Sequence, residues 1–163
     1  MKTVLCYGDS NTWGHDPETR TRYPPDVRWA GVLADRLGPG YRVIEEGLNG
    51  RTTRWDGPME PGRNGLTYLR PCVESHQPLH MIVVMLGTND LNRRFDLSAS
   101  DIAQCAAGLA EQARQLAAGW RHVPFFDAGS VIVSSEKDGI HLDADEHRKL
   151  GQALAGEVRR LIG

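Results

Sequence analysis

Two apolar runs that stop abruptly at a glycine constrain the fold of this chain most. Residues 3–7 are rich in β-branched and aromatic side chains and end at Gly-Asp-Ser (8–10), and residues 81–86 end at Gly-Thr-Asn-Asp (87–90). Such runs, without polar alternation, are typical of strands covered on both faces, as in a parallel sheet. An open α/β sheet presents functional groups at the carboxyl ends of its strands. We therefore expect both polar stretches to lie at that edge of the sheet.

The other elements follow from periodicity and from glycine and proline signals. Residues 11–26 are polar and rich in proline, which predicts a loop over the site expected at this edge of the sheet. A capping box at residues 98–101 precedes one of the expected helices. The predicted helices cover residues 29–37, a short stretch around 66–73, residues 102–116 and the end of the chain from 143 or 144, and the remaining predicted strands are 41–45 and 123–126.

Length and composition indicate one compact domain over residues 1–163, since 40% of the residues are hydrophobic. A formal net charge of -2 provides no basic stripe for nucleic acid. The sequence contains no apolar run long enough to cross a membrane and no export signal, so we expect a cytoplasmic protein that binds no membrane. Cys6, Cys72 and Cys105 lie far apart, which suggests neither a disulfide framework nor a zinc site.

Ser10 is the candidate nucleophile, and residues 138–141 (Asp-Gly-Ile-His) are the candidate source of a base. An acid three residues before a histidine, with a glycine between them, can hold carboxylate and imidazole together and fix the imidazole tautomer. Each feature also has a simpler explanation: a helix cap or turn for Ser10, a surface turn for residues 138–141, and ordinary turns for residues 47–53 and 87–90. Trp13 either lines a substrate pocket or covers the edge of the core.

Four blocks in this order resemble the motif set of the SGNH (GDSL) hydrolase family: residues 8–10, 47–50, 87–90 and 138–141. Residues 27–33, 43–53 and 123–130 are also similar to the bacterial arylesterase/acyltransferase branch of that family. The resemblance covers nearly the whole chain. It implies a flavodoxin-like, three-layer α/β/α fold with a parallel sheet in the order 2-1-3-4-5, and chemistry that uses no metal and no cofactor.

The resemblance also implies a role for each matching position. Ser10 attacks an acyl carbonyl, His141 takes its proton and later activates water, and Asp138 orients His141. The backbone N–H groups of Ser10 and Gly50 and the side-chain amide of Asn89 form the oxyanion hole. The other histidines match no block and are expected to be structural or solvent-facing; they are His15, His76, His80, His122 and His147.

One βα unit of the family pattern is missing, because only about half a dozen residues connect Leu116 to Val123, too few for a parallel crossover. We expect a sheet of four strands, with residues 123–126 in the fourth position. This brings the loop 138–141 about 5 Å closer to Ser10, a shift that the loop 127–137 absorbs. In the alternative, another chain supplies the missing strand or covers the surface it leaves, as in a homo-oligomer. The loss of this βα unit also predicts a shallower site that is more open to water.

The first functional hypothesis is therefore a serine esterase that hydrolyses small acyl esters, acetyl or another short-chain group. A carbohydrate O-deacetylase or a thioesterase is the nearest rival, because a triad specifies acyl transfer but not the leaving group. The second hypothesis is a weakly active or inactive α/β domain that binds an acylated ligand or assembles with a partner, since the missing unit can loosen the triad.

Overall fold

A three-stranded parallel sheet forms the centre of the molecule, and β1 (Lys2–Gly8) is its middle strand. In this computed structural model, which describes residues 1–57, 60–116 and 124–163, β2 (Tyr41–Gly47) pairs with one edge of β1 and β3 (Met81–Met85) with the other. The register sets Gly8 beside both Gly47 and Met85, so the carboxyl ends of the three strands are level. The order β2-β1-β3 agrees with the start of the predicted order 2-1-3-4-5.

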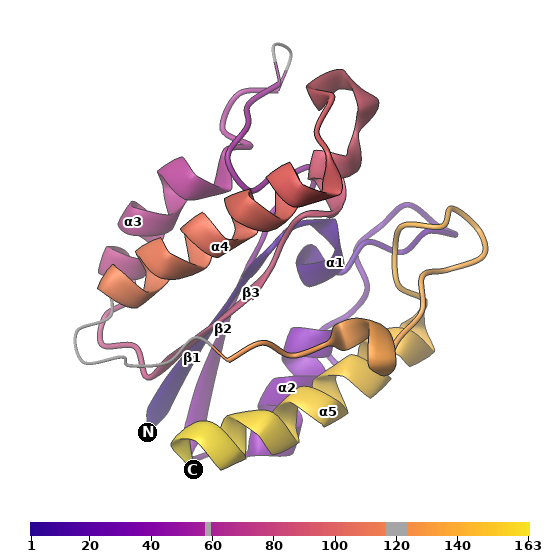
Figure 1. Cartoon of the computed structure of the whole chain (residues 1–163). Coiled ribbons are helices and arrows are strands. Elements are labelled where there is room, and N and C mark those ends of the chain that lie inside the picture. The colour runs from indigo at the N-terminus through magenta and orange to yellow at the C-terminus, as the bar shows by residue number, and fades with distance from the viewer. Residues whose placement is uncertain (58–59, 117–123) are drawn as a thin grey trace.

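Helices cover both faces of the sheet, as Figure 1 shows. The pair α2 (Trp29–Leu37) and α5 (Ala144–Ile162) packs on one face, and α3 (Gly65–Ser75) and α4 (Ala99–Leu116) pack on the other. The predicted three-layer α/β/α architecture is confirmed. No helix in the described ranges combines the length and the apolar character needed to cross a bilayer.

β1 explains why the chain forms three layers. Successive side chains of a strand point to opposite faces of the sheet, and all of the side chains from Val4 to Tyr7 are fully buried. Val4 and Cys6 belong to the core under α2 and α5, whereas Leu5 and Tyr7 belong to the core under α3 and α4. A strand that is apolar on both faces buries all of its side chains only when it lies between two helical layers.

The shorter elements lie where the chain leaves the sheet. The predicted loop 11–26 overlaps a single helical turn, α1 (Ser10–Trp13), so the assignment of its first residues to a loop was wrong. Two 3-10 turns, η1 (Thr88–Leu91) and η2 (Arg93–Phe95), follow β3, and η3 (Ala128–Ser130) follows the gap after α4. The predicted capping box is confirmed, since the Asp101 N–H donates to Ser98 Oγ at 3.2 Å.

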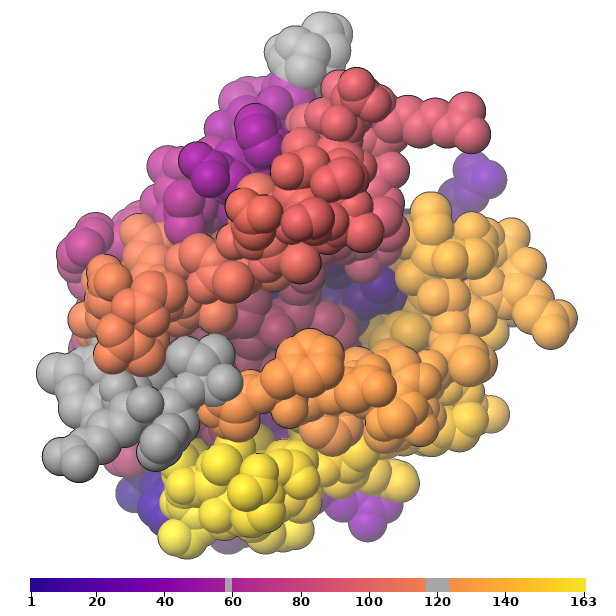
Figure 2. All heavy atoms as spheres, in the orientation of Figure 1, coloured from indigo at the N-terminus to yellow at the C-terminus, as the bar shows by residue number. Residues whose placement is uncertain are grey.

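The predicted fourth strand is absent from the described part of the chain. Val123, like the connection before it, lies outside the described residues, and Pro124–Phe126 form no strand. The alternation of a strand nevertheless persists, because Phe125 is 90% exposed whereas Phe126 packs against the core under α2 and α5. Proline has no N–H to donate to a sheet ladder. Figure 2 shows a hollow between α4 and the segment that follows residue 123.

The close packing of α5 on α2 gives a test of the fold with a built-in control. A Cβ on Gly151 would lie 2.6 Å from the Trp29 carbonyl oxygen and 2.7 Å from Val32 Cβ, whereas one on Gly156 in the same helix would meet nothing within 4 Å. Gly156→Ala is therefore expected to raise the free energy of unfolding by about 0.5–1 kcal/mol through helix propensity, and Gly151→Ala to lower it by about 1–3 kcal/mol through overpacking. Urea unfolding measures both, and equal stabilisation by the two substitutions contradicts this packing.

Candidate active site

Ser10 stands where β1 ends and the single turn α1 begins. The Asp9 carboxylate caps this turn, since Oδ1 accepts from the Asn11 backbone N–H at 2.9 Å. Gly8 permits the crossing, because a Cβ there would lie 2.0 Å from Thr12 Oγ1 and 2.7 Å from the Met85 carbonyl oxygen. The Ser10 side chain is thereby fixed at the carboxyl edge of the sheet with 7% of the residue exposed.

The structure brings Ser10, His141 and Asp138 together in one chain of hydrogen bonds. His141 Nε2 lies 2.9 Å from Ser10 Oγ, and His141 Nδ1 lies 2.7 Å from Asp138 Oδ2. These distances are within the reach required between a nucleophile, its base and an orienting acid. The loop of His141 therefore reaches Ser10 although the predicted fourth strand, which was expected to bring it closer, is not formed in the described part of the chain.

The Asp138 carboxylate orients both the imidazole and the backbone that carries it. Its Oδ1 accepts from the backbone N–H groups of Ile140 and His141, each at 2.9 Å, and Gly139 turns the chain with φ 70°. Burial acts to raise the pKa of Asp138, but the hydrogen bonds from the His141 ring and from these two N–H groups outweigh it and lower the pKa to about 2. Asp138 is therefore a carboxylate at any pH above about 3, and its partners favour the charged form.

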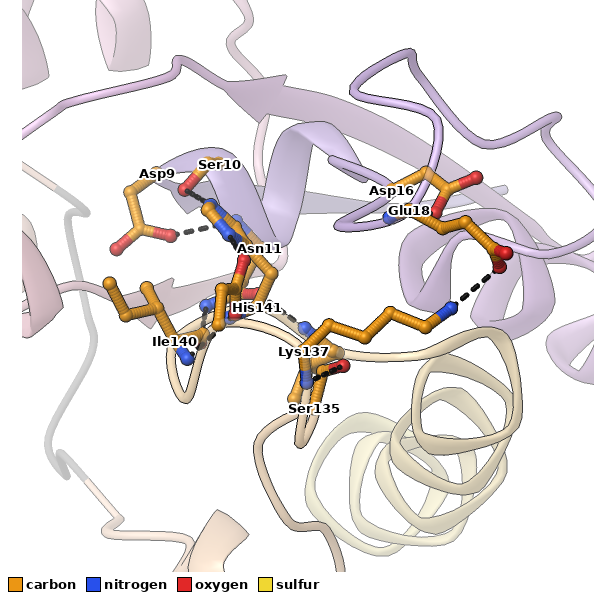
Figure 3. Close-up of polar contacts among 11 residues, drawn as sticks. Asp9, Ser10, Asn11, Asp16, Glu18, Ser135, Lys137, Ile140 and His141 are labelled. Carbon is orange, nitrogen blue, oxygen red and sulfur yellow. Dashed lines mark hydrogen bonds and ion pairs between the residues drawn. The ribbon is translucent and has the colours of Figure 1, made fainter.

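Asn11 ties the loop of the base to the turn of Ser10. Its amide nitrogen donates to the Ile140 carbonyl at 3.2 Å, and its amide oxygen accepts from the Leu142 N–H at 3.0 Å. Figure 3 shows Asn11 between Ser10 and the loop that carries Ile140 and His141. The sequence assigned residue 11 to a loop with no function, because nothing local marks an amide that pairs with residues so far along the chain.

The other two predicted oxyanion donors lie in loops that follow β2 and β3. Gly50 has φ 75°, and no hydrogen bond among the described residues uses its backbone N–H. Asn89, in η1, donates one amide N–H to the Arg51 carbonyl at 3.0 Å, which leaves its second N–H for a ligand.

A buried arginine and a buried acid fix these loops to the sheet. The guanidinium of Arg51, a residue only 2% exposed, donates to the Gly8 carbonyl at 2.9 Å and lies 4.2 Å from the centroid of the Tyr7 ring. The Asp90 carboxylate accepts from both the N–H and the hydroxyl of Thr53. Neither contact was anticipated from the sequence, although Arg51 and Thr53 belong to a stretch that resembles the family.

Two histidines outside the motif blocks have different surroundings. His147 is fully buried in α5, where burial first, and then the charges of Arg28 and His141, lower its pKa to about 4. Its Nδ1 accepts from the Trp29 N–H at 3.3 Å, so it has a structural contact. His15 instead packs on the ring of His141, with 4.3 Å between the ring centroids. The prediction that His15 is structural or solvent-facing overlooked this contact. Trp13 lies next to it, 6.3 Å from the His15 ring centroid.

Burial also perturbs the acid that caps α1. Burial of Asp9, which is 1% exposed, raises its pKa to about 6, against the opposing effects of the Asn11 N–H and the charges of His141 and Arg51. Protonated Asp9 therefore contributes to the stability of the folded state at pH values below its pKa in the unfolded chain. This contribution to the free energy of unfolding is lost as the pH rises through about 6.

Among the described residues, one trio has the side chains and spacing of metal ligands. The ligand atoms of Glu46, Cys72 and His76 all lie within 4.8 Å of one another. His76 Nε2 and Glu46 Oε1 are already hydrogen-bonded at 2.8 Å, and burial raises the pKa of the Cys72 thiol to about 12, so the thiol stays protonated. A metal would have to displace the proton of this thiol, and the trio includes no residue of the proposed site.

Comparisons with known proteins show the family of this chain. The sequence model of the GDSL-like lipase/acylhydrolase family matches residues 6–126. Among solved structures, the inhibitor-bound M. smegmatis aryl esterase is 36% identical, with a TM-score of 0.92 and coverage of 99% of this chain and 100% of that one. Est24, a carbohydrate acetylesterase from Sinorhizobium meliloti, is 33% identical, with a TM-score of 0.92 and the same coverage.

A third similar structure is that of a putative arylesterase from Agrobacterium tumefaciens. It is 34% identical, with a TM-score of 0.87 and coverage of 99% of this chain and 100% of that one. A search of curated protein sequences returns no match.

Proposed function

The chain belongs to the GDSL-like lipase/acylhydrolase family and is an esterase, and from that premise we propose that Ser10, His141 and Asp138 are its catalytic triad and that it hydrolyses acetyl or other short acyl esters. The observation that carries the proposal is the unbroken series of hydrogen bonds from Asp138 through both ring nitrogens of His141 to the Ser10 hydroxyl. Such a series is the geometric signature of an activated serine.

The triad performs two acyl transfers. Ser10 Oγ attacks the carbonyl carbon while His141 Nε2 takes its proton, and Asp138 stabilises the imidazolium that results. When the tetrahedral intermediate collapses, the bond to the leaving oxygen breaks and His141 returns the proton to the alcohol. Water, deprotonated by His141, then attacks the acyl group on Ser10, and the collapse of the second intermediate releases the carboxylic acid and the free serine.

Three donors stabilise the oxyanion of both intermediates: the backbone N–H groups of Ser10 and Gly50 and the side-chain amide of Asn89. Two features of the loops support this assignment. The Gly50 N–H is not used by any hydrogen bond of the described residues, and the Asn89 amide is held by one of its two N–H groups and has the other to offer. Donors fixed before the reaction stabilise developing charge without the cost of reorganisation.

Small acyl groups are proposed because a carbohydrate acetylesterase is among the similar structures. Two cavities of the described structure, of about 360 Å³ and 220 Å³, lie elsewhere and are not lined by Ser10, His141 or Trp13. A long acyl chain gains affinity only by burying its apolar surface. Trp13 is assigned to the rim of the acyl site because its ring lies beside that of His15, which in turn contacts His141.

Carbohydrate O-deacetylation is a second candidate, supported by the 33% identity to a carbohydrate acetylesterase. The triad is the same in both cases, and only the leaving alcohol differs. Comparing kcat/KM for p-nitrophenyl acetate and for an acetylated xylo-oligosaccharide separates them. A higher kcat/KM on the sugar, despite its poorer leaving group, favours the deacetylase.

A fluorophosphonate probe tests the nucleophile directly, because it reacts with an activated serine and not with an ordinary hydroxyl. We expect one covalent adduct, on Ser10, located by peptide mass spectrometry, and loss of p-nitrophenyl acetate hydrolysis in parallel with labelling. Ser134→Ala, which removes an exposed serine of the loop before Asp138, is expected to label like the wild type. An adduct on another residue, or hydrolysis that survives complete labelling, contradicts the assignment. Absence of both labelling and hydrolysis favours the inactive-domain alternative.

A further inference from the structure

His15 touches the proposed base from a loop that no motif block includes. It follows α1, whose end is marked by Gly14, and its backbone N–H donates to the Ser10 carbonyl at 3.0 Å. Its ring lies with its centroid 4.3 Å from that of His141 and is tilted by 41°. Because His141 uses both nitrogens on Ser10 and Asp138, the contact from His15 is made by packing of the two rings and not by a hydrogen bond.

The loop of His15 is held against the loop of His141 by a second contact. The Lys137 ammonium and the Glu18 carboxylate form an ion pair at 2.6 Å. Figure 3 shows this pair on the side of His141 away from Asp9, with the chain around Asp16 and Glu18 facing the loop of Lys137. The two loops, from opposite ends of the sequence, therefore meet around the imidazole of His141.

The surroundings of His15 favour its neutral form, and burial has the largest effect. Burial first, and then the charge of protonated His141, lower the pKa of His15. The charges of Asp138, from the opposite loop, and of Asp16, from the same loop, raise the pKa of His15. The charge of Arg20 lowers it, as that of His141 does. A histidine with a lowered pKa is uncharged at neutral pH, and its aromatic ring then presents a π system to its neighbour.

We infer that His15 is a positioning residue for His141: its neutral ring holds the imidazole between Ser10 and Asp138 and stabilises the imidazolium that forms when Ser10 gives up its proton. This inference rests on the proposed triad. The stabilisation is of the kind that an aromatic ring gives a cation within about 6 Å of its centroid. It acts mainly in the transition state, when His141 carries the charge, and so it is expected in kcat and not in KM.

The same contact predicts what happens in acid. Two imidazolium rings at this separation repel each other, so a positive charge on His15 opposes the charge that His141 acquires when it takes the proton of Ser10. Protonation of His15 turns a stabilising neighbour into an opposing charge. Every variant of residue 15 keeps the other charged groups around the two rings, which are Asp138, Asp16, Arg20 and the buried Asp9. A comparison of these variants therefore measures the effect of His15 alone.

Four variants test the inference with p-nitrophenyl acetate as the probe. His15→Phe keeps the ring and is expected to retain kcat within about twofold, whereas His15→Ala loses it and lowers kcat on the order of 3- to 10-fold at unchanged KM. His15→Lys places a permanent charge there and is expected to lower kcat on the order of tenfold, with part of the loss restored at high salt. Thr21→Ala, an exposed change in the same loop, is the control and leaves kcat unchanged.

A pH profile separates positioning from mere support of the fold. On the acid side, the logarithmic slope of kcat/KM against pH is expected to be shallower in His15→Phe than in the wild type, because protonation of His15 places a positive charge beside His141 and phenylalanine takes up no proton. Wild-type kcat and slope in all three His15 variants overturn the inference, and so does a loss that appears only in KM or in the unfolding temperature. If Ser10→Ala retains activity, the proposed triad fails; if Ser10→Ala is inactive while the His15 variants match the wild type, only the role of His15 fails.

Discussion

Replacing Ser10 with alanine is expected to lower kcat for p-nitrophenyl acetate by about 10⁴- to 10⁶-fold. In the proposed mechanism the substitution removes the atom that forms the acyl-enzyme, and His141 supplies no covalent route in its place. Residual hydrolysis comes from the oxyanion donors and from binding alone, which in other triad enzymes is a small remainder. The concentration of wild-type enzyme is determined by titration with the fluorophosphonate probe. The concentration of the variant, which lacks the serine that the probe labels, is determined by absorbance.

The fold of the Ser10→Ala variant is expected to remain intact. Ser10 Oγ has one side-chain partner, His141 Nε2, and the partner is itself partly exposed, with 18% of its side chain in contact with solvent. Water can therefore replace the lost hydroxyl at small cost. An unchanged urea midpoint, together with lost activity, assigns the effect to chemistry. Activity within tenfold of the wild type means that Ser10 is not the nucleophile.

Replacing Asn89 with alanine gives the second largest expected effect, a loss of about 100- to 1,000-fold in kcat with little change in KM. The amide N–H that stabilises the oxyanion acts on a charge that exists only in the transition state, so its removal leaves binding of the ground state nearly unaffected. Asn89 also donates to the Arg51 carbonyl, and a stability loss of about 1 kcal/mol is expected from that hydrogen bond.

Asn92→Ala is the matched control for Asn89. Asn92 lies three residues further along, is exposed, and its amide oxygen caps η2 by accepting from the Arg94 N–H at 3.1 Å. Its replacement is expected to cost about 1 kcal/mol of stability and to leave kcat unchanged. If Asn92→Ala slows the enzyme as much as Asn89→Ala does, general disturbance of this segment, and not loss of an oxyanion donor, explains both.

The sheet and its helices were predictable because each follows from a local pattern. The run that became β1 is buried on both faces, and the periodicity of residues 29–37 corresponds residue for residue to α2. The residues of the proposed triad were named from the family resemblance, with which their local placement is consistent. The acid and base lie three positions apart, and the nucleophile directly follows a strand that must end at the carboxyl edge of a parallel sheet.

The fourth strand could not be excluded from the sequence, because the pattern of Pro124–Phe126 reports which side chains face the core and not whether a neighbouring backbone pairs with them. Phe126 is packed as it would be in a strand, yet the described sheet ends at β3. The turn α1 was missed because four residues are too few to reveal a helical period.

The contacts that support the proposed site were the least predictable part. Asn11 holds the loop of the base, Arg51 fixes the loops of the oxyanion donors, and His15 covers the base, but each of the three acts on a partner that is distant in sequence. No periodicity or motif spacing encodes such pairs. They depend on the relative placement of loops, which only the packed structure provides.

The separation of Ser10 and His141 by 131 positions has a consequence for the synthesis of the protein. The strand of the nucleophile and both loops of the oxyanion donors leave the ribosome before the loop of the base, which is then held in place by α5 packed on α2. Since chains emerge amino end first, a growing chain holds a serine that no base activates. In the proposed mechanism, hydrolytic activity therefore begins only when the loop of His141 has been made and has docked against the turn of Ser10, and the serine is inert until then.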